Sequence, residues 1–148
     1  MQARFLIVVL AVALSACAMA AQQDQAALSP DALHLAGTHW RFAKVESHDV
    51  PTGVSATLVF ERNGHVSGHA GCNGYGGPWS ASNGALHFGG MISTKMACLQ
   101  PAGTMSTEHD VFAALRQTAR VRIQNHRLML LDANGSALAT LEPQGGSQ

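Results

Sequence analysis

Short apolar segments separated by glycine and asparagine turns make up most of the chain from about Leu33 onward. Alternating apolar and polar residues predict strands near residues 40–45, 57–61 and 65–70. The pair Asn63-Gly64 lies between the second and third of these segments. An Asn-Gly pair flanked by strand-forming residues is the strongest short-range signal for a hairpin. An antiparallel β-meander is therefore predicted for this region.

Three further turns of the same kind follow, and they contain Asn83-Gly84, Asn125 and Asn134-Gly135. Each turn separates two short segments rich in strand-forming residues. These segments are residues 79–80 and 86–88 around the first turn, 121–123 and 128–131 around the second, and 128–131 and 137–141 around the third. The meander is thus predicted to continue almost to the end of the chain.

One segment late in the sequence has a helical period instead. Its apolar residues recur three to four positions apart, namely Val111, Phe112, Leu115 and Ala119. The preceding Thr107-Glu108-His109-Asp110 has the form of a capping box, which makes Glu108 a first-turn acid favoured by the helix dipole. We therefore expect a helix over about residues 105–118.

The length of 148 residues leaves room for one domain and an export segment. The order of the elements predicts an α+β fold, an antiparallel β meander forming a half-barrel with one late inserted helix. We place this domain at residues 33–142, with a frayed tail at 143–148.

The first residues have the features of a signal peptide. Arg4 precedes an apolar run from Phe5 to Leu14, which at ten residues is too short to span a bilayer as a helix. The run ends in Leu14-Ser15-Ala16-Cys17, which resembles a bacterial lipobox. We therefore expect a lipoprotein signal peptide at residues 1–16 and acylation of Cys17, which anchors the chain in a membrane.

The segment 17–32 is rich in alanine and glutamine and is interpreted as a tether. Ala18 is not the aspartate that usually retains such lipoproteins in the inner membrane, so the expected location is the periplasmic face of the outer membrane. The alternative is cleavage after Ala18-Met19-Ala20 by ordinary signal peptidase, which would give a soluble periplasmic protein.

Charge gives no indication of a nucleic-acid partner. The chain has nine Lys and Arg against nine Asp and Glu, and without the leader, which contains Arg4 and no acid, the net charge is −1. Proteins that bind phosphate backbones usually carry a basic surplus. Nucleic acid is therefore not expected as a partner.

Two cysteines, Cys72 and Cys98, are left in the exported domain once Cys17 is acylated or removed. An even number of thiols in an oxidising compartment predicts a disulfide between them. The alternative, a reactive or redox cysteine, lacks the usual Cys-x-x-Cys spacing.

No catalytic, cofactor or metal motif is present. The acidic residues are single and dispersed, and neither a nucleophile elbow nor a phosphate loop occurs, so no enzyme activity and no cofactor are expected. A periplasmic metal-binding protein is the third alternative, because His65 and His69 share one strand face and Met91, Met96 and Met105 could add sulfur ligands. Solvated strand positions account for most of the histidines without a metal.

Glycines crowd around Cys72-Asn73, at Gly68, Gly71, Gly74, Gly76 and Gly77. Such a density implies positive φ angles and close backbone approach, and Asn73 also tolerates the left-handed conformation. Two interpretations remain for the apolar residues that follow: an ordinary packed core, or a cleft open at one end. The candidate lining residues are Tyr75, Trp79, Phe88, Met91, Phe112 and Leu115.

Several of these segments together resemble the META domain (HslJ-like) family. The matching residues are Gly37-Thr38-His39-Trp40, Val66-Ser67-Gly68, Gly71-Cys72-Asn73 with Tyr75, Gly77 and Trp79, Ser93 to Cys98, then Glu108, Phe112 and Leu115, and finally Leu128 to Leu131. The resemblance implies a half-barrel with a helix in an envelope-associated or secreted protein linked to heat and antibiotic stress, and it implies no established activity. We expect a non-catalytic binding or assembly module that contacts an envelope protein or an acyl chain. The alternative function is a passive structural element of the envelope.

Overall fold

The computed structural model describes residues 35–145, so the predicted signal peptide, Cys17 and the tether lie outside the described residues, as do residues 146–148. The elements, in chain order, are β1 (Thr38–Val45), β2 (His48–Asp49), β3 (Thr57–Phe60), β4 (His65–His69), β5 (Gly74–Ser82), β6 (Ala85–Phe88), β7 (Ile92–Ser93), α2 (Thr104–Gln117), β8 (Arg120–Gln124), β9 (Arg127–Leu131) and β10 (Ala137–Pro143).

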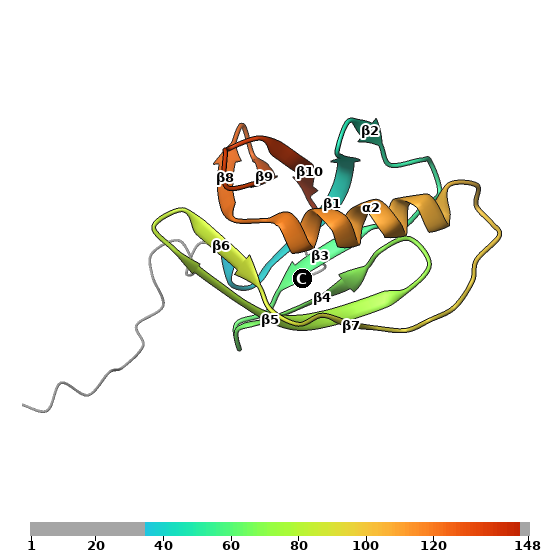
Figure 1. The fold of residues 1–148 in the computed structure, drawn as a ribbon, viewed down its shortest axis with the longest axis horizontal. Helices are drawn as coiled ribbons and strands as arrows, with labels where there is room; N and C mark the ends of the chain where they lie inside the picture. Colours follow the sequence, from blue (N-terminus) through green and yellow to red (C-terminus); the bar gives the residue numbers. More distant parts are fainter. Residues whose placement is uncertain (1–34, 146–148) are drawn as a thin grey trace, which may run out of the picture.

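The strands form one antiparallel sheet that returns to its own first strand. The pairing runs β1-β3-β4-β5-β6-β8-β9-β10, and β10 pairs with β1 again, while the short strands β2 and β7 attach to β1 and β5. The strand pairing around the ring is shortest between β6 and β8, and we call this place the narrow joint. Within the described part of the chain these two strands share only the residue pair Ala85–Arg120. The sheet is therefore ring-like without being a regular barrel, and the predicted α+β half-barrel with a late helix is confirmed (Figure 1).

The core lies inside this ring, and helix α2 lies across it (Figure 1). Alternate residues of the strands point inward, as the alternation in the sequence predicted. The largest fully buried side chains include Phe42, Leu58, Phe60, Leu86, Leu128, Leu130 and Leu141. Helix α2 adds Val111, Ala114 and Leu115 to this core.

The hairpin turns are confirmed where asparagine predicted them. Asn83 and Gly84 have φ angles of 52° and 77°, and Asn125 and His126 have φ angles of 51° and 61°. Two consecutive positive φ angles are what the common two-residue hairpin turn requires, and asparagine is among the few residues that adopt them readily.

Helix α2 spans Thr104–Gln117, close to the predicted residues 105–118, but its cap differs from the prediction. Gly103 is the N-cap, no side chain caps the helix, and the N–H of Thr107 already donates to the oxygen of Gly103 within the first turn. The predicted capping box at Thr107–Asp110 is therefore wrong, because these residues are inside the helix. Glu108 is likewise not a first-turn acid, and its carboxylate has another partner, described below.

The C-terminal strand is longer than predicted. Pro143 still pairs with Trp40, and the N–H of Gln144 donates to the oxygen of His39 at 2.9 Å. The first two residues of the predicted frayed tail are therefore attached to β1.

Candidate functional site

The buried amide of Asn73 connects three separate segments of the chain. Its side-chain nitrogen donates to both carboxylate oxygens of Glu108 on α2, at 3.0 and 2.9 Å, and its backbone N–H donates to Glu108 at 2.9 Å. The same side-chain nitrogen also donates to the backbone oxygen of Met96. The Asn73 carbonyl oxygen accepts from the Thr94 hydroxyl at 2.8 Å and from the N–H of Met96 at 2.7 Å. We call these contacts the Asn73 network.

The sequence interpretation of Asn73 and its glycines needs correction. Asn73 does not have a positive φ, and of the five glycines around it only Gly71 does, at 87°. Asparagine is needed at position 73 for its side-chain amide, because both the nitrogen and the oxygen of that amide have hydrogen-bond partners in the network. It is not needed for a left-handed backbone conformation.

Close approach explains two of the glycines. A Cβ at Gly71 would collide with the backbone oxygen of Thr104, at the start of α2. A Cβ at Gly68 would collide with the backbone oxygen of Thr57 and would reach the Tyr75 hydroxyl at 2.9 Å. Glycine is needed where backbones come this close, so these two residues allow α2 and β3 to pack against β4 and the turn that follows it.

The predicted disulfide between Cys72 and Cys98 is confirmed. The two Cα atoms lie 5.7 Å apart, which is ordinary for a disulfide. The bond joins the turn after β4 to the loop before α2, next to the Asn73 network. Covalent and hydrogen bonds thus hold the start of α2 against the sheet.

Helix α2 has two different faces. One face points into the core and contains Thr104, Thr107, Val111 and Ala114. The other carries Met105, His109, Phe112 and Arg116, spaced four, three and four residues apart, so these side chains lie along one side of the helix. This second face is one wall of a surface cleft of about 740 Å³, which we call the α2 cleft.

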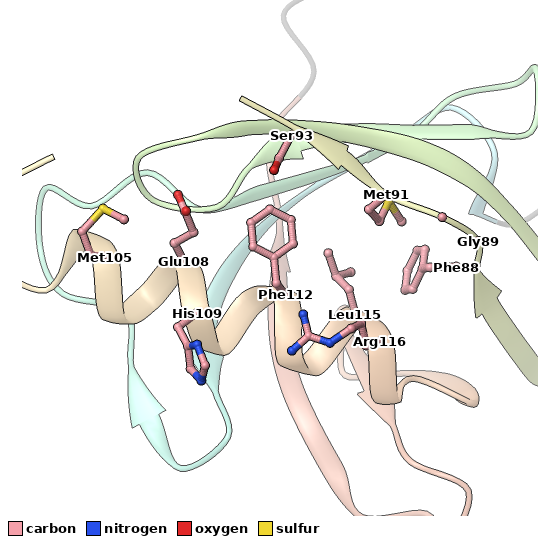
Figure 2. A pocket seen from close by; sticks show the side chains of 11 residues that line it. Phe88, Gly89, Met91, Ser93, Met105, Glu108, His109, Phe112, Leu115 and Arg116 are labelled. Carbon is pink, nitrogen blue, oxygen red and sulfur yellow. The ribbon is translucent and has the colours of Figure 1, made fainter. Parts of the chain in front are cut away.

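The opposite wall of the α2 cleft is the chain from the end of β6 to β7. Figure 2 shows Phe88, Met91 and Ser93 facing α2 across the opening. The full set of lining residues is Phe88, Gly89, Gly90, Met91 and Ser93 on this wall and Met105, Glu108, His109, Phe112, Leu115 and Arg116 on the helix. Phe88, Met91 and Phe112 are partly buried and pack against the core.

Of the six residues proposed for a cleft, Phe88, Met91 and Phe112 line the α2 cleft from partly buried positions. Leu115 also borders it but is a core residue, 1% exposed, and two residues do not line it. Tyr75 and Trp79 belong to the core and are 6% and 8% exposed. The Tyr75 hydroxyl donates to the oxygen of Thr57 at 2.8 Å, and burial raises the pKa of this phenol far above its ordinary value. Tyr75 still supports the cleft from behind, because its ring meets Phe112 edge-on at 5.6 Å.

Five lining side chains were not singled out as cleft residues from the sequence: Ser93, Met105, Glu108, His109 and Arg116. The spacing of Met105, His109, Phe112 and Arg116 on one helix side could have indicated most of them. Ser93 lies 15 residues before Glu108, outside the helix, so no local pattern connects it with them.

The two histidines considered as metal ligands are exposed at the ends of β4. In the part of the chain that the structure describes, no group of three or more His, Cys, Asp or Glu side chains is close enough to hold a metal ion.

Within residues 35–145 no helix has the length and apolar character needed to cross a membrane.

Comparison with known proteins gives a family and a fold. The META domain matches residues 33–145. Among solved structures, an NMR structure of a protein from Burkholderia xenovorans is similar, with a TM-score of 0.63 and 27% identity over 78% of this chain and 87% of the other. A second NMR structure, 22% identical over 75% of this chain and 92% of the other, has a TM-score of 0.60 and shows the same fold. A search of curated proteins found no match. Because the family match covers most of the chain, the protein belongs to the META domain family.

Proposed function

We propose that this META-domain protein is a non-catalytic binding module that holds an apolar chain, such as an acyl chain, in the α2 cleft. The observation that carries the proposal is the cleft itself, with the partly buried Phe88, Met91 and Phe112 along its length. Its volume of about 740 Å³ is within the range of roughly 300–1,000 Å³ that is usual for small-ligand sites. The unbranched side chains of Met91 and Met105 adapt easily to a flexible ligand.

The arrangement of polar groups favours binding over catalysis. A general base needs a carboxylate that is free to accept a proton from a substrate. The carboxylate in the α2 cleft belongs to Glu108, and both of its oxygens accept hydrogen bonds from Asn73. We therefore assign Glu108 a structural role.

The setting that we propose is the bacterial envelope. Acylation of Cys17 would hold the protein at the periplasmic face of the outer membrane, with residues 17–32 as the tether. The Cys72–Cys98 disulfide supports an oxidising compartment. The link to heat and antibiotic stress, and contact with a further envelope protein, rest on the resemblance to the META domain family.

A passive structural element is the competing function, and it would need no cleft. An open cleft that presents Phe88, Met91 and Phe112 beside a packed core favours a ligand. Native mass spectrometry of the protein, purified gently from membranes, should show a mass increment from a bound lipid. In parallel, a fluorescent fatty acid should bind to the delipidated protein with saturation. A folded domain that takes up no such probe at up to millimolar concentration would contradict the proposal.

A further inference from the structure

Arg116 borders the α2 cleft and forms no salt bridge with any residue of the described range 35–145. It lies in the last turn of α2, is exposed, and shares the cleft face with His109 and Phe112. Figure 2 shows its side chain extending from the last turn back along the helix, in the direction of His109. A cation thus borders the apolar part of the cleft.

The basic residues that form salt bridges in the described part of the chain are Arg41 and Arg127, both with Glu142, and Lys44, with Asp49. Within residues 35–145 no carboxylate oxygen lies within 4.0 Å of a guanidinium nitrogen of Arg116. Glu108 is eight residues earlier on the helix, about 12 Å along the axis between the two Cα atoms, and its carboxylate is bound by Asn73. The N–H donors of the guanidinium remain available to an anion.

We propose that the natural ligand of the α2 cleft is a single-chain anionic amphiphile whose head group pairs with Arg116. Its alkyl chain would lie among Phe88, Met91 and Phe112. The inference rests on the proposed function, because it assumes that the cleft holds an alkyl chain, and it adds the charge of the head group and the direction of the ligand.

Charge complementarity carries this choice. A neutral amphiphile gains nothing from the charge of the exposed Arg116, whereas a carboxylate or phosphate accepts two N–H bonds from a guanidinium in a planar geometry. The apolar residues form one row between a helix and the short strand β7, which suits one chain. A fatty acid and a lysophospholipid share this chemistry, with a carboxylate or a phosphate as the head.

The test compares three twelve-carbon ligands below their micelle concentrations: laurate, lauroyl lysophosphatidate and dodecanol. Affinities are measured by calorimetry for wild type, Arg116→Gln and Arg116→Lys. Arg122→Gln is the matched control, because Arg122 is exposed on β8 and does not line the cleft. Circular dichroism melting confirms that each variant is folded, as expected for exposed positions.

Wild type should bind at least one of the two anions more tightly than dodecanol. Arg116→Gln should weaken binding of that anion about three- to tenfold and leave dodecanol unchanged. Arg116→Lys should retain most of the preference, and Arg122→Gln should change nothing. The stronger of the two anions identifies the head group as carboxylate or phosphate.

Two results would overturn the proposal in different ways. Equal binding of dodecanol and both anions, or an Arg116→Gln loss that is the same for charged and uncharged ligands, would contradict the head-group assignment while the cleft remained a binding site. Failure of folded wild type to bind any of the three would overturn the proposed function as well.

Discussion

The side-chain nitrogen of Asn73 lies 3.0 and 2.9 Å from the two carboxylate oxygens of Glu108, a residue 35 positions later in the chain. The amide is 1% exposed, and its own oxygen is occupied by Thr94 and Met96. One side chain therefore connects the turn after β4, the loop before α2 and the helix.

Replacing Asn73 with alanine should destabilise the domain by about 3 kcal/mol, because it removes several hydrogen bonds and leaves buried polar groups without partners. The control is Asn63→Ala, at an exposed asparagine that donates to Glu61 at 3.0 Å, and it should cost less than about 1 kcal/mol. Urea unfolding of the two variants measures the difference. Equal losses would show that the Asn73 network does not stabilise the fold as argued.

The Cys72–Cys98 disulfide should contribute roughly 3–4 kcal/mol, which is what the chain-entropy model gives for cysteines 26 residues apart. The double variant Cys72→Ser/Cys98→Ser should lose this amount in urea unfolding. Wild type unfolded in the presence of reductant should behave like the double variant, and non-reducing peptide mapping should find the two cysteines joined. Alkylation of both thiols in the native, unreduced protein would contradict the presence of the disulfide.

Phe112 and Phe60 should respond differently to truncation. Phe60 is fully buried, so Phe60→Ala should cost about 3–5 kcal/mol. Phe112 is partly buried and has the α2 cleft on one side, so Phe112→Ala should cost less, about 1–2 kcal/mol, and should reduce uptake of a fluorescent fatty acid. A loss of stability as large as that of Phe60→Ala would mean that Phe112 acts as a core residue.

Acid should remove a small stabilising contribution of Glu61. Hydrogen bonds from Ser67 and Asn63 lower the pKa of this carboxyl below its ordinary value of 4.5. A pKa that is lower in the folded state stabilises the fold fully above the unfolded pKa, and this contribution is lost as the pH falls through the folded pKa. The stability difference between wild type and Glu61→Gln should therefore shrink below about pH 4.5.

The NMR titration of Glu61 gives a direct check. Ser67→Ala removes the main hydrogen bond and should raise the pKa of Glu61 toward its ordinary value. An unchanged titration in that variant would contradict this account of the shift.

Membrane attachment should depend on Cys17. A fatty-acid probe fed to cells should label the wild-type protein, and Cys17→Ser should abolish the label, because the thiol is the site of acylation in a lipobox. Cys98→Ser is the matched control and should leave the label in place. An unlabelled wild-type protein that begins at Ala21 would instead be soluble in the periplasm.

The local parts of this fold could be predicted from the sequence because their causes are local. The turn at Asn83-Gly84 fixes the hairpin of β5 and β6 through the backbone preferences of its own two residues. The disulfide followed from the number of cysteines, without any knowledge of geometry. The extent of α2 followed from its helical period, but the capping box was wrong, because Gly103 is the N-cap and Thr107 lies inside the helix.

The candidate site could be predicted only in part. Strand alternation shows that Tyr75 and Trp79 point inward, but it does not distinguish a core from a cleft, since both present apolar side chains on the same face of the sheet. The pairing of Asn73 with Glu108 depends on how β4, β5 and α2 pack, so no pattern near either residue contains it.

The narrow joint between β6 and β8 has a consequence for how the protein opens. It is held by the pair Ala85–Arg120 and by bonds from the N–H groups of Leu86 and Val121 to neighbouring carbonyls. Regions with few bonds open first during native-state fluctuations, and separating this joint would turn β6 and β8 into edge strands that can pair with another molecule. Arg120 and Arg122 would then lie on an exposed edge, where their charge repels a second copy of the same strand. The arginines of β8 are thus placed where their charge would oppose edge-to-edge pairing if the ring opened at this joint.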